Sequence, residues 1–436
     1  YSYKPTYLAQ QMGQFDGIEA LCDGQFWADG SFINGSAIPN FTTCFQHTVL
    51  VFVPCAFFWL LFPIFLAQLH RIRIKKGYTS LYWSALLCTK FVLTNFLNII
   101  SLFILGKSIY SLIRDESVPA INFIYPTILF VTMVGISACI LLAKRHGMVT
   151  SGILHLTWIV FLICGAPEFY AWLQRVTTPE LLANTELARC IAYLIWYPII
   201  VVQAFLFCFA DPRRHWITEL TMKYNRSPEL DSSFLNRLTL WWFNPIPIVG
   251  ARKDLELEDL FQLNEGNTSA YLIPQWEALW HPAMQRYKER KQRLINEDTS
   301  VAYQKQTSKN DGFKDENDCV TLKTKSKVKP PSIVWRLFLM FRYEILTATA
   351  VKLMSDVLQF SSPFLLNELI GFVSDANSPL WLGIVYALAM FACSELRSFL
   401  INYYFFLMFR AGIKIQTTLT AAVYKKVNSL IFMQIF

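Results

Sequence analysis

The sequence predicts an all-α polytopic membrane protein. Of its 436 residues, 54% are hydrophobic and only 16% are charged, whereas soluble domains carry about a quarter charged residues. Apolar runs long enough to cross a bilayer recur along the chain, and each needs about 20 residues. Lys and Arg gather in the loops beside these runs, as is typical of cytoplasmic loops. The net charge of +8 therefore indicates membrane orientation and gives no reason to expect nucleic acid as a partner.

Five apolar runs in the first half predict a five-helix membrane domain over residues 48–210, after a polar tail over residues 1–47. The runs are Thr48–Leu69, Leu81–Leu105, Ile121–Ala143, Ser151–Leu173 and Arg189–Ala210. Each is long enough for a transmembrane helix.

The loops between these runs alternate in charge. One set holds Arg71 to Lys76, Lys144 with Arg145, and Arg213 with Arg214, while acidic residues offset the basic ones in the other set. Basic loops stay in the cytoplasm. We therefore expect an integral membrane protein with an extracellular N-terminus and a cytoplasmic chain from residue 211. We expect the plasma membrane, with a vacuolar or other internal membrane as the alternative.

The polar tail holds features of an extracellular segment. Cys22 and Cys44 lie in it, as do the sequons that begin at Asn34 and Asn40. In an oxidising compartment we expect a disulfide between the two cysteines and glycans on the two asparagines. The alternative is two free thiols and unused sequons.

Residues 211–330 form the expected cytoplasmic linker. Within it, Ser232 or Ser233 is a suitable N-cap for an amphipathic helix over Phe234–Phe243. Three- and four-residue steps place Leu238, Trp241 and Trp242 on its apolar face. Tryptophan favours the membrane interface, so we expect this helix on the cytoplasmic leaflet. The alternative is that it packs on protein.

The rest of the linker is polar. Residues 285–329 hold almost no apolar clusters, so we expect this segment to be disordered. Two longer apolar runs then follow over Tyr343–Val373 and Leu380–Phe409, joined by the short turn Ser374–Pro379. They bring the number of predicted spans to seven.

Two helical faces in these last runs are the candidate binding residues. Lys352, Ser355, Asp356 and Gln359 share one face of the first run, and Arg397, Ile401 and Phe405 share one stripe of the second. Charges inside a span are costly and usually face a bundle interior or a watery cavity. Such faces suit an anion with an apolar end. The alternatives are a Lys352–Asp356 ion pair that only orients its helix, and a stripe that only packs between helices.

The sequence holds no motif for a catalytic or metal site. The phosphate-binding pattern G-x-x-x-x-G-K-[ST] is absent, and no Cys/His cluster has zinc spacing. We expect no catalytic residue, no metal site and no cofactor within these residues.

Several segments together resemble the C subfamily of ABC exporters, the multidrug resistance-associated proteins. The matching segments are Cys44–Cys55, Ser151–Leu154, Phe234–Phe243, Asp259–Asn264, Lys352–Asp356 and Phe360–Pro363. The resemblance implies a five-helix extra domain, a lasso-like cytoplasmic linker, and the first two helices of an exporter transmembrane domain over residues 331–436.

The resemblance also implies a function. It is that of an ATP-driven pump for organic anions such as glutathione, glucuronide or sulfate conjugates and drugs, with ATP and Mg²⁺ on nucleotide-binding domains outside this chain. In such pumps the lysine matching Lys352 lines the substrate cavity, and Ile401 and Phe405 match an apolar pocket. Ser355 stands where several relatives have His.

The resemblance fades after Lys426, where family members continue into further spans. A truncated gene model, a read-through intron and a deliberate fragment are all open. Two other functions stay open as well. One is a channel regulator like the sulfonylurea receptors, and the other is a non-transporting membrane scaffold.

Overall fold

The computed structural model describes residues 21–22, 26, 41–74, 80–114, 118–177, 184–213, 227–308, 329–374 and 380–435. Over these residues the chain is helical and has no extended strand. It divides into two compact units: residues 1–261 with 366–389, and residues 262–365 with 390–436. The sequons at Asn34 and Asn40 lie outside the described residues, so glycosylation stays a prediction.

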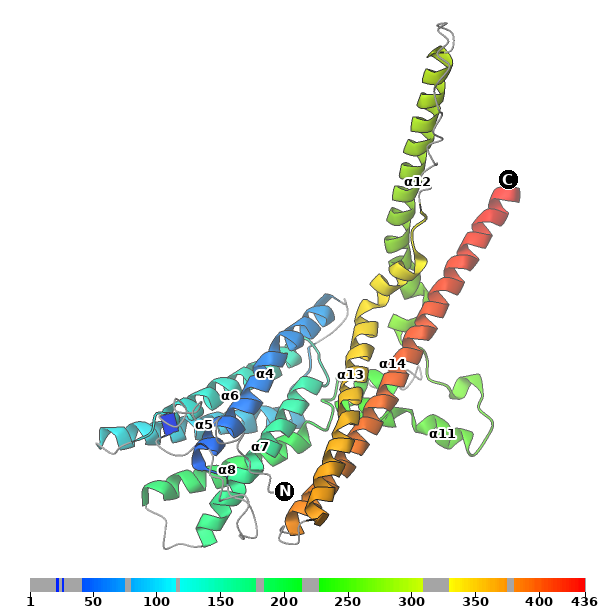
Figure 1. Ribbon diagram of the computed structural model, residues 1–436. Coiled ribbons are helices and arrows are strands. Elements are labelled where there is room, and N and C mark those ends of the chain that lie inside the picture. The colour runs from blue at the N-terminus through cyan, green and yellow to red at the C-terminus, as the bar shows by residue number, and fades with distance from the viewer. Residues whose placement is uncertain are drawn as a thin grey trace. The chain divides into compact units, whose positions relative to one another are not determined.

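The first unit contains a bundle of five long helices (Figure 1). They are α4 (Thr43–Ile74), α5 (Ala85–Ile113), α6 (Ile121–Arg145), α7 (Gly152–Thr177) and α8 (Asn184–Leu206). In this bundle α5 packs on α6 and α8, while α4 packs on α6 and α7. Each helix covers most of one of the five apolar runs, and several contain an internal proline, which membrane helices tolerate.

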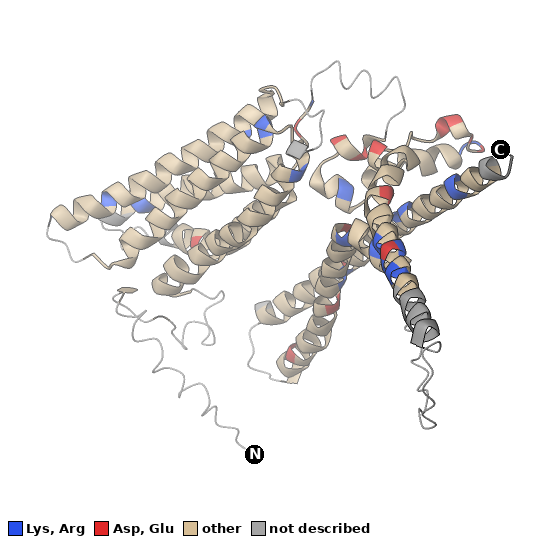
Figure 2. Cartoon of the chain, turned by 90° about the horizontal axis from the view of Figure 1, so that it is seen from above, with Lys and Arg blue, Asp and Glu red and all other residues tan. Residues whose placement is uncertain are grey.

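The bundle is apolar both inside and outside. Large side chains such as Phe58, Met133 and Trp158 are fully buried between the helices, while Ile99 and Ile163 are exposed on the outside. Figure 2 shows that charged residues are sparse along these helices. An apolar outer surface is suited to lipid rather than to water. The protein is therefore an all-α integral membrane protein.

Within the described residues, six helices are long and apolar enough to cross a membrane: the five of the bundle and the run Leu382–Ile431. The apolar runs of the sequence predict seven spans. The remaining candidate, Tyr343–Val373, lies in α13 (Ile333–Ser374), which is long enough but not among the six. Lys352, Asp356 and their polar neighbours lower its hydropathy, so this helix needs polar partners to lie in a membrane.

A buried ion pair joins distant segments of the bundle. Lys90, on α5, is only 2% exposed, and its Nζ lies 2.9 Å from Oδ1 of Asp211, beyond the end of α8. The same ammonium donates to the carbonyl of Phe209 at 3.1 Å. The backbone N–H of Asp211 donates to the carbonyl of Val149, just before α7, at 2.9 Å. These contacts hold the end of α8 beside the starts of α5 and α7. Sequence patterns did not reveal this pair.

The second unit contains α12 (Ser269–Ser308) and most of α13 and α14 (Leu380–Ile435). Leu272 and Trp276 of α12 pack on Leu337 and Phe341 of α13. Glu277 of α12 also lies 2.6 Å from Lys425 of α14. The start of α12 is therefore held on both long helices.

One expectation about this unit needs correction. The segment over residues 285–329 was predicted to be disordered, yet α12 continues to Ser308, and residues 309–328 lie outside the described part. Lys, Arg, Glu and Gln are good helix formers, so this polar segment can continue the helix as far as Ser308. The last apolar run ends at Phe409, and α14 continues beyond it to Ile435. No proline interrupts this extension, and Lys414 on it contacts Glu344 at 2.5 Å.

We predict that Asp211→Asn destabilises the bundle, because it leaves the Lys90 ammonium buried without its counter-charge. The expected loss is about 3 kcal/mol or more, measured as a lower thermal unfolding midpoint of the purified protein in detergent. Asp259→Asn is the matched control, since Asp259 pairs with exposed Lys253 at 2.7 Å and exposed pairs contribute little.

The double variant Lys90→Met/Asp211→Leu removes both charges. It is expected to recover most of the lost midpoint, since apolar replacement of a buried pair is often neutral. An Asp211→Asn protein as stable as the native one would contradict a stabilising role for the pair.

Candidate functional site

The two helices that carry the candidate binding residues run antiparallel (Figure 1). Two contacts set their alignment in the second unit: Lys414 meets Glu344, and Arg397 meets Gln359. One turn of helix is about four residues. One turn before Gln359 on α13 and one turn after Arg397 on α14, Ser355 is therefore level with Ile401. The next turn brings Lys352 level with Phe405. The residues predicted on two separate faces therefore follow one another along the same hairpin.

Lys352 is engaged within its own helix. Its Nζ lies 2.5 Å from Oδ1 of Asp356, one turn further along α13. The structure thus contains the Lys352–Asp356 ion pair, which is the alternative to a free substrate anchor. The charges of these two side chains compensate one another.

Arg397 reaches across to the other helix. Its Nη2 donates to Oε1 of Gln359 at 3.2 Å. The sequence placed Gln359 on the same face as Lys352 but did not predict its partner, because the partner depends on the register between the two helices.

Ser355, Ile401 and Phe405 complete this face. Ser355 is fully buried, at 0% exposed, and its hydroxyl has no hydrogen-bond partner among the described residues. Ile401 is half-buried, whereas the side chain of Phe405 is 50% exposed. The face thus combines a cross-helix cation, a buried hydroxyl and apolar surface. We call residues 352, 355, 356, 359, 397, 401 and 405 the hairpin face.

The linker differs from its predicted form. The expected helix over Phe234–Phe243 is divided into α10 (Phe234–Leu238) and a 3-10 turn, η4 (Trp241–Phe243). Leu240 adopts a left-handed backbone conformation with φ of 56°, which a continuous right-handed helix does not allow. Pro245 begins the next helix, α11 (Pro245–Gly250), since proline fits a first helical turn.

The linker's predicted interface residues differ in exposure. Trp241 is 68% exposed, and Phe243 and Ile248 are exposed as well, while Leu238 and Trp242 are half-buried. An exposed cluster of this kind suits a membrane surface. The interfacial position of Leu238, Trp241 and Trp242 stays a prediction.

The beginning of α10 is docked on the bundle. The backbone N–H of Phe234 donates to Oγ1 of Thr150 at 3.1 Å, and its ring lies 5.8 Å from that of His155. A Cβ placed on Gly152 would lie 2.5 Å from the Phe234 ring. Only glycine therefore leaves room for this ring at the start of α7. At this end the linker packs on protein, as the alternative interpretation held.

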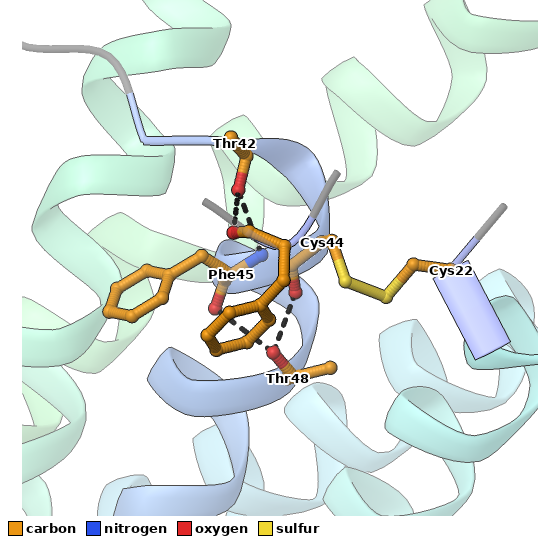
Figure 3. The surroundings of a disulfide bond; sticks show 6 residues. Cys22, Thr42, Cys44, Phe45 and Thr48 are labelled. Atoms are coloured by element: carbon orange, nitrogen blue, oxygen red, sulfur yellow. Dashed lines mark hydrogen bonds between the residues drawn. A yellow bond between two sulfur atoms is a disulfide. The ribbon is translucent and has the colours of Figure 1, made fainter. Parts of the chain in front are cut away.

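The N-terminal tail is tied to the first helix. A disulfide joins Cys22 to Cys44, whose Cα atoms are 5.5 Å apart (Figure 3). Next to it, Oγ1 of Thr42 donates to the carbonyl of Phe26 at 2.6 Å, and Oγ1 of Thr48 donates to the carbonyl of Cys44 at 2.7 Å. These contacts hold a short part of the tail at the start of α4.

In the described part of the chain, no group of three His, Cys, Asp or Glu side chains could hold a metal ion. The chemistry that the hairpin face supports is recognition by charge, hydrogen bonding and apolar contact.

The fold and the polar hairpin face define the class as a polytopic helical membrane protein, and its known relatives give the family. The chain is 43% identical over 398 residues to multidrug resistance protein mrp-7 of Caenorhabditis elegans, covering 90% of this chain and 24% of that protein. It is 29% identical over 415 residues to human ATP-binding cassette sub-family C member 3, covering 94% of this chain and 26% of the relative. It is 27% identical over 428 residues to human ATP-binding cassette sub-family C member 2, covering 95% of this chain and 26% of that relative. No protein-family model matches.

The chain belongs to the multidrug resistance proteins of ATP-binding cassette sub-family C. It spans about a quarter of the length of the curated relatives that it matches.

We predict that Gly152→Ala loosens the linker from the bundle, because the added methyl group would overlap the Phe234 ring. Limited proteolysis within residues 228–250 should become several-fold faster. Gly106→Ala is the matched control, since a Cβ there meets nothing within 4 Å. Adding Phe234→Ala should not speed cleavage further. Equal cleavage rates in Gly152→Ala and native protein would show that this contact does not hold the linker.

We also predict that the exposed linker surface binds membranes. A peptide of residues 227–261, whose tryptophans are Trp241 and Trp242, should show blue-shifted fluorescence with vesicles that contain phosphatidylserine. Trp241→Ser should weaken partitioning about tenfold, corresponding to about 1.4 kcal/mol, and more than Trp242→Ser does. Equal effects of the two substitutions would argue against Trp241 as the interfacial contact.

Proposed function

We propose that these residues are the N-terminal part of an ATP-driven exporter of amphipathic organic anions. The relatives are named multidrug resistance and ATP-binding cassette proteins, which supports an exporter in general. The hairpin face is the observation that carries the choice of substrate. It places Arg397 and Phe405 on one helix of the pair, and so offers a cation and apolar surface to one ligand, while the Ser355 hydroxyl is buried.

In this proposal each segment has a part. Residues 48–210 form the five-helix extra domain below an extracellular tail over residues 1–47. Residues 211–330 form the cytoplasmic linker, and residues 331–436 supply the first two helices of the exporter domain. The protein would act in the plasma membrane. A vacuolar or other internal membrane is the alternative.

ATP does not fit a site within these residues, because the sequence has no phosphate-binding loop. ATP and Mg²⁺ would act on nucleotide-binding domains beyond them. The role of the hairpin face is to bind substrate. A cation at membrane depth replaces the water that an anionic group loses, and the aromatic surface covers the apolar part of the ligand.

The substrates we propose are glutathione, glucuronide and sulfate conjugates and anionic drugs. In inside-out vesicles that contain the full-length protein, we expect uptake of labelled conjugates that requires ATP and is saturable. Vesicles without the protein are the control. A broad panel of conjugates with no nucleotide-dependent uptake would contradict the exporter function, and co-purification with an inward-rectifier channel would favour a channel regulator instead.

A further inference from the structure

We propose that the five-helix bundle binds one ordered water molecule beside the Lys90–Asp211 ion pair, and that this water connects the pair to the linker through Thr150. The site concerns the joint between the bundle and the linker. It therefore goes beyond the exporter function and is independent of which substrate the protein takes.

A small cavity lies where α5, α6 and the start of α7 meet the end of α8. Its volume is about 20 Å³, and about 10–15 Å³ is enough for one water molecule, which also needs about two to four polar partners. The polar side chains in the cavity lining are Lys90, Lys144, Thr150, Ser151 and Asp211. The cavity therefore has the size and the polarity for one water molecule, and it is too small for an organic ligand.

The ion pair can bind such a water while keeping its own contact. An ammonium has three N–H donors. Among the described residues, Nζ of Lys90 donates to Oδ1 of Asp211 at 2.9 Å and to the carbonyl of Phe209 at 3.1 Å, which leaves one donor. The Asp211 carboxylate has a second oxygen that can accept. A water that accepts from Lys90 and donates to Asp211 therefore joins both members of the pair.

Thr150 connects the same cavity to the linker. Its Oγ1 accepts a hydrogen bond from the backbone N–H of Phe234 at 3.1 Å. A hydroxyl can accept and donate at the same time, so Thr150 is able to hold the linker and to donate its hydrogen to the water. The result is a continuous chain of hydrogen bonds from Lys90 to Phe234, and the members of such a chain polarise and strengthen one another.

The charges around the cavity favour a neutral ligand. The charge of Lys90 is compensated by Asp211, and both residues are buried. Lys144 also lines the cavity, but its Nζ lies over the ring of Trp83, 4.2 Å from the ring centre, which is a favourable position for a cation. A water molecule completes the hydrogen bonds of the site and leaves these charge contacts in place.

Two substitutions test the site from different sides in the full-length protein. Thr150→Val keeps the shape of the side chain and removes the hydroxyl, whereas Thr150→Ser keeps the hydroxyl. Ala143→Cys adds a sulfur atom to the cavity wall and leaves the ion pair and Thr150 unchanged. Ala204→Cys is the matched control, because Ala204 is 9% exposed like Ala143 but does not line the cavity.

The readout is the rate of limited proteolysis within residues 228–250, with the thermal unfolding midpoint measured alongside as a check of folding. We expect Ala143→Cys to speed cleavage about threefold by displacing the water. Thr150→Val should speed it about tenfold, because it also removes the bond to Phe234. The double variant should be cleaved no faster than Thr150→Val, since both changes break the same chain. Thr150→Ser and Ala204→Cys should be cleaved at the native rate.

Ala143→Cys protein cleaved at the native rate would overturn the proposal, as would independent, multiplying effects in the double variant. Equal acceleration by Ala204→Cys would assign the effect to any buried thiol and overturn it as well. A cryo-EM map of the native full-length protein provides a test without substitutions. It should show density about 2.7–3.2 Å from Lys90 Nζ and Thr150 Oγ1, and a map that resolves ordered waters elsewhere but none here would contradict the site.

Discussion

The structure depends on one constraint. Inside a membrane, a charged side chain must contact a polar or oppositely charged group of the protein, because no water is present there to solvate it. In the bundle, Lys90 meets Asp211, and this pair holds the ends of three helices together. In the hairpin, Lys352 meets Asp356. In the same hairpin, Arg397 donates to Gln359 of the facing helix.

The linker shows how one segment serves two environments. Its first residue in α10, Phe234, is placed by the space above Gly152 and by the hydroxyl of Thr150. After the left-handed turn at Leu240, the chain presents Trp241 outward. The turn separates a part that packs on the bundle from a part with an apolar exposed surface. A continuous helix could not divide its contacts in this way.

Much of the architecture follows from patterns along the chain. The five bundle helices coincide with the apolar runs, because lipid requires long uninterrupted apolar segments. The predictions were wrong where local composition does not determine the backbone conformation. The polar residues before Ser308 were expected to be disordered, yet they form a helix, which agrees with the high helix propensity of Lys, Arg, Glu and Gln. Trp241 and Trp242 were assigned to one helix because their spacing fits helical periodicity. The spacing of residues does not show that Leu240 adopts a left-handed backbone conformation.

Lys352, Ser355, Arg397, Ile401 and Phe405 could be chosen from the sequence, since helical periodicity within a span depends only on residue spacing. Sequence alone thus determined the class of protein, the order of its helices and the residue types available for binding. The tertiary structure decided which charges meet. Lys352 finds Asp356 one turn away, but Arg397 finds Gln359 only through the register between two helices. Charge compensation depends on distances of a few ångströms in space. The sequence of one helix does not determine its distance from another helix.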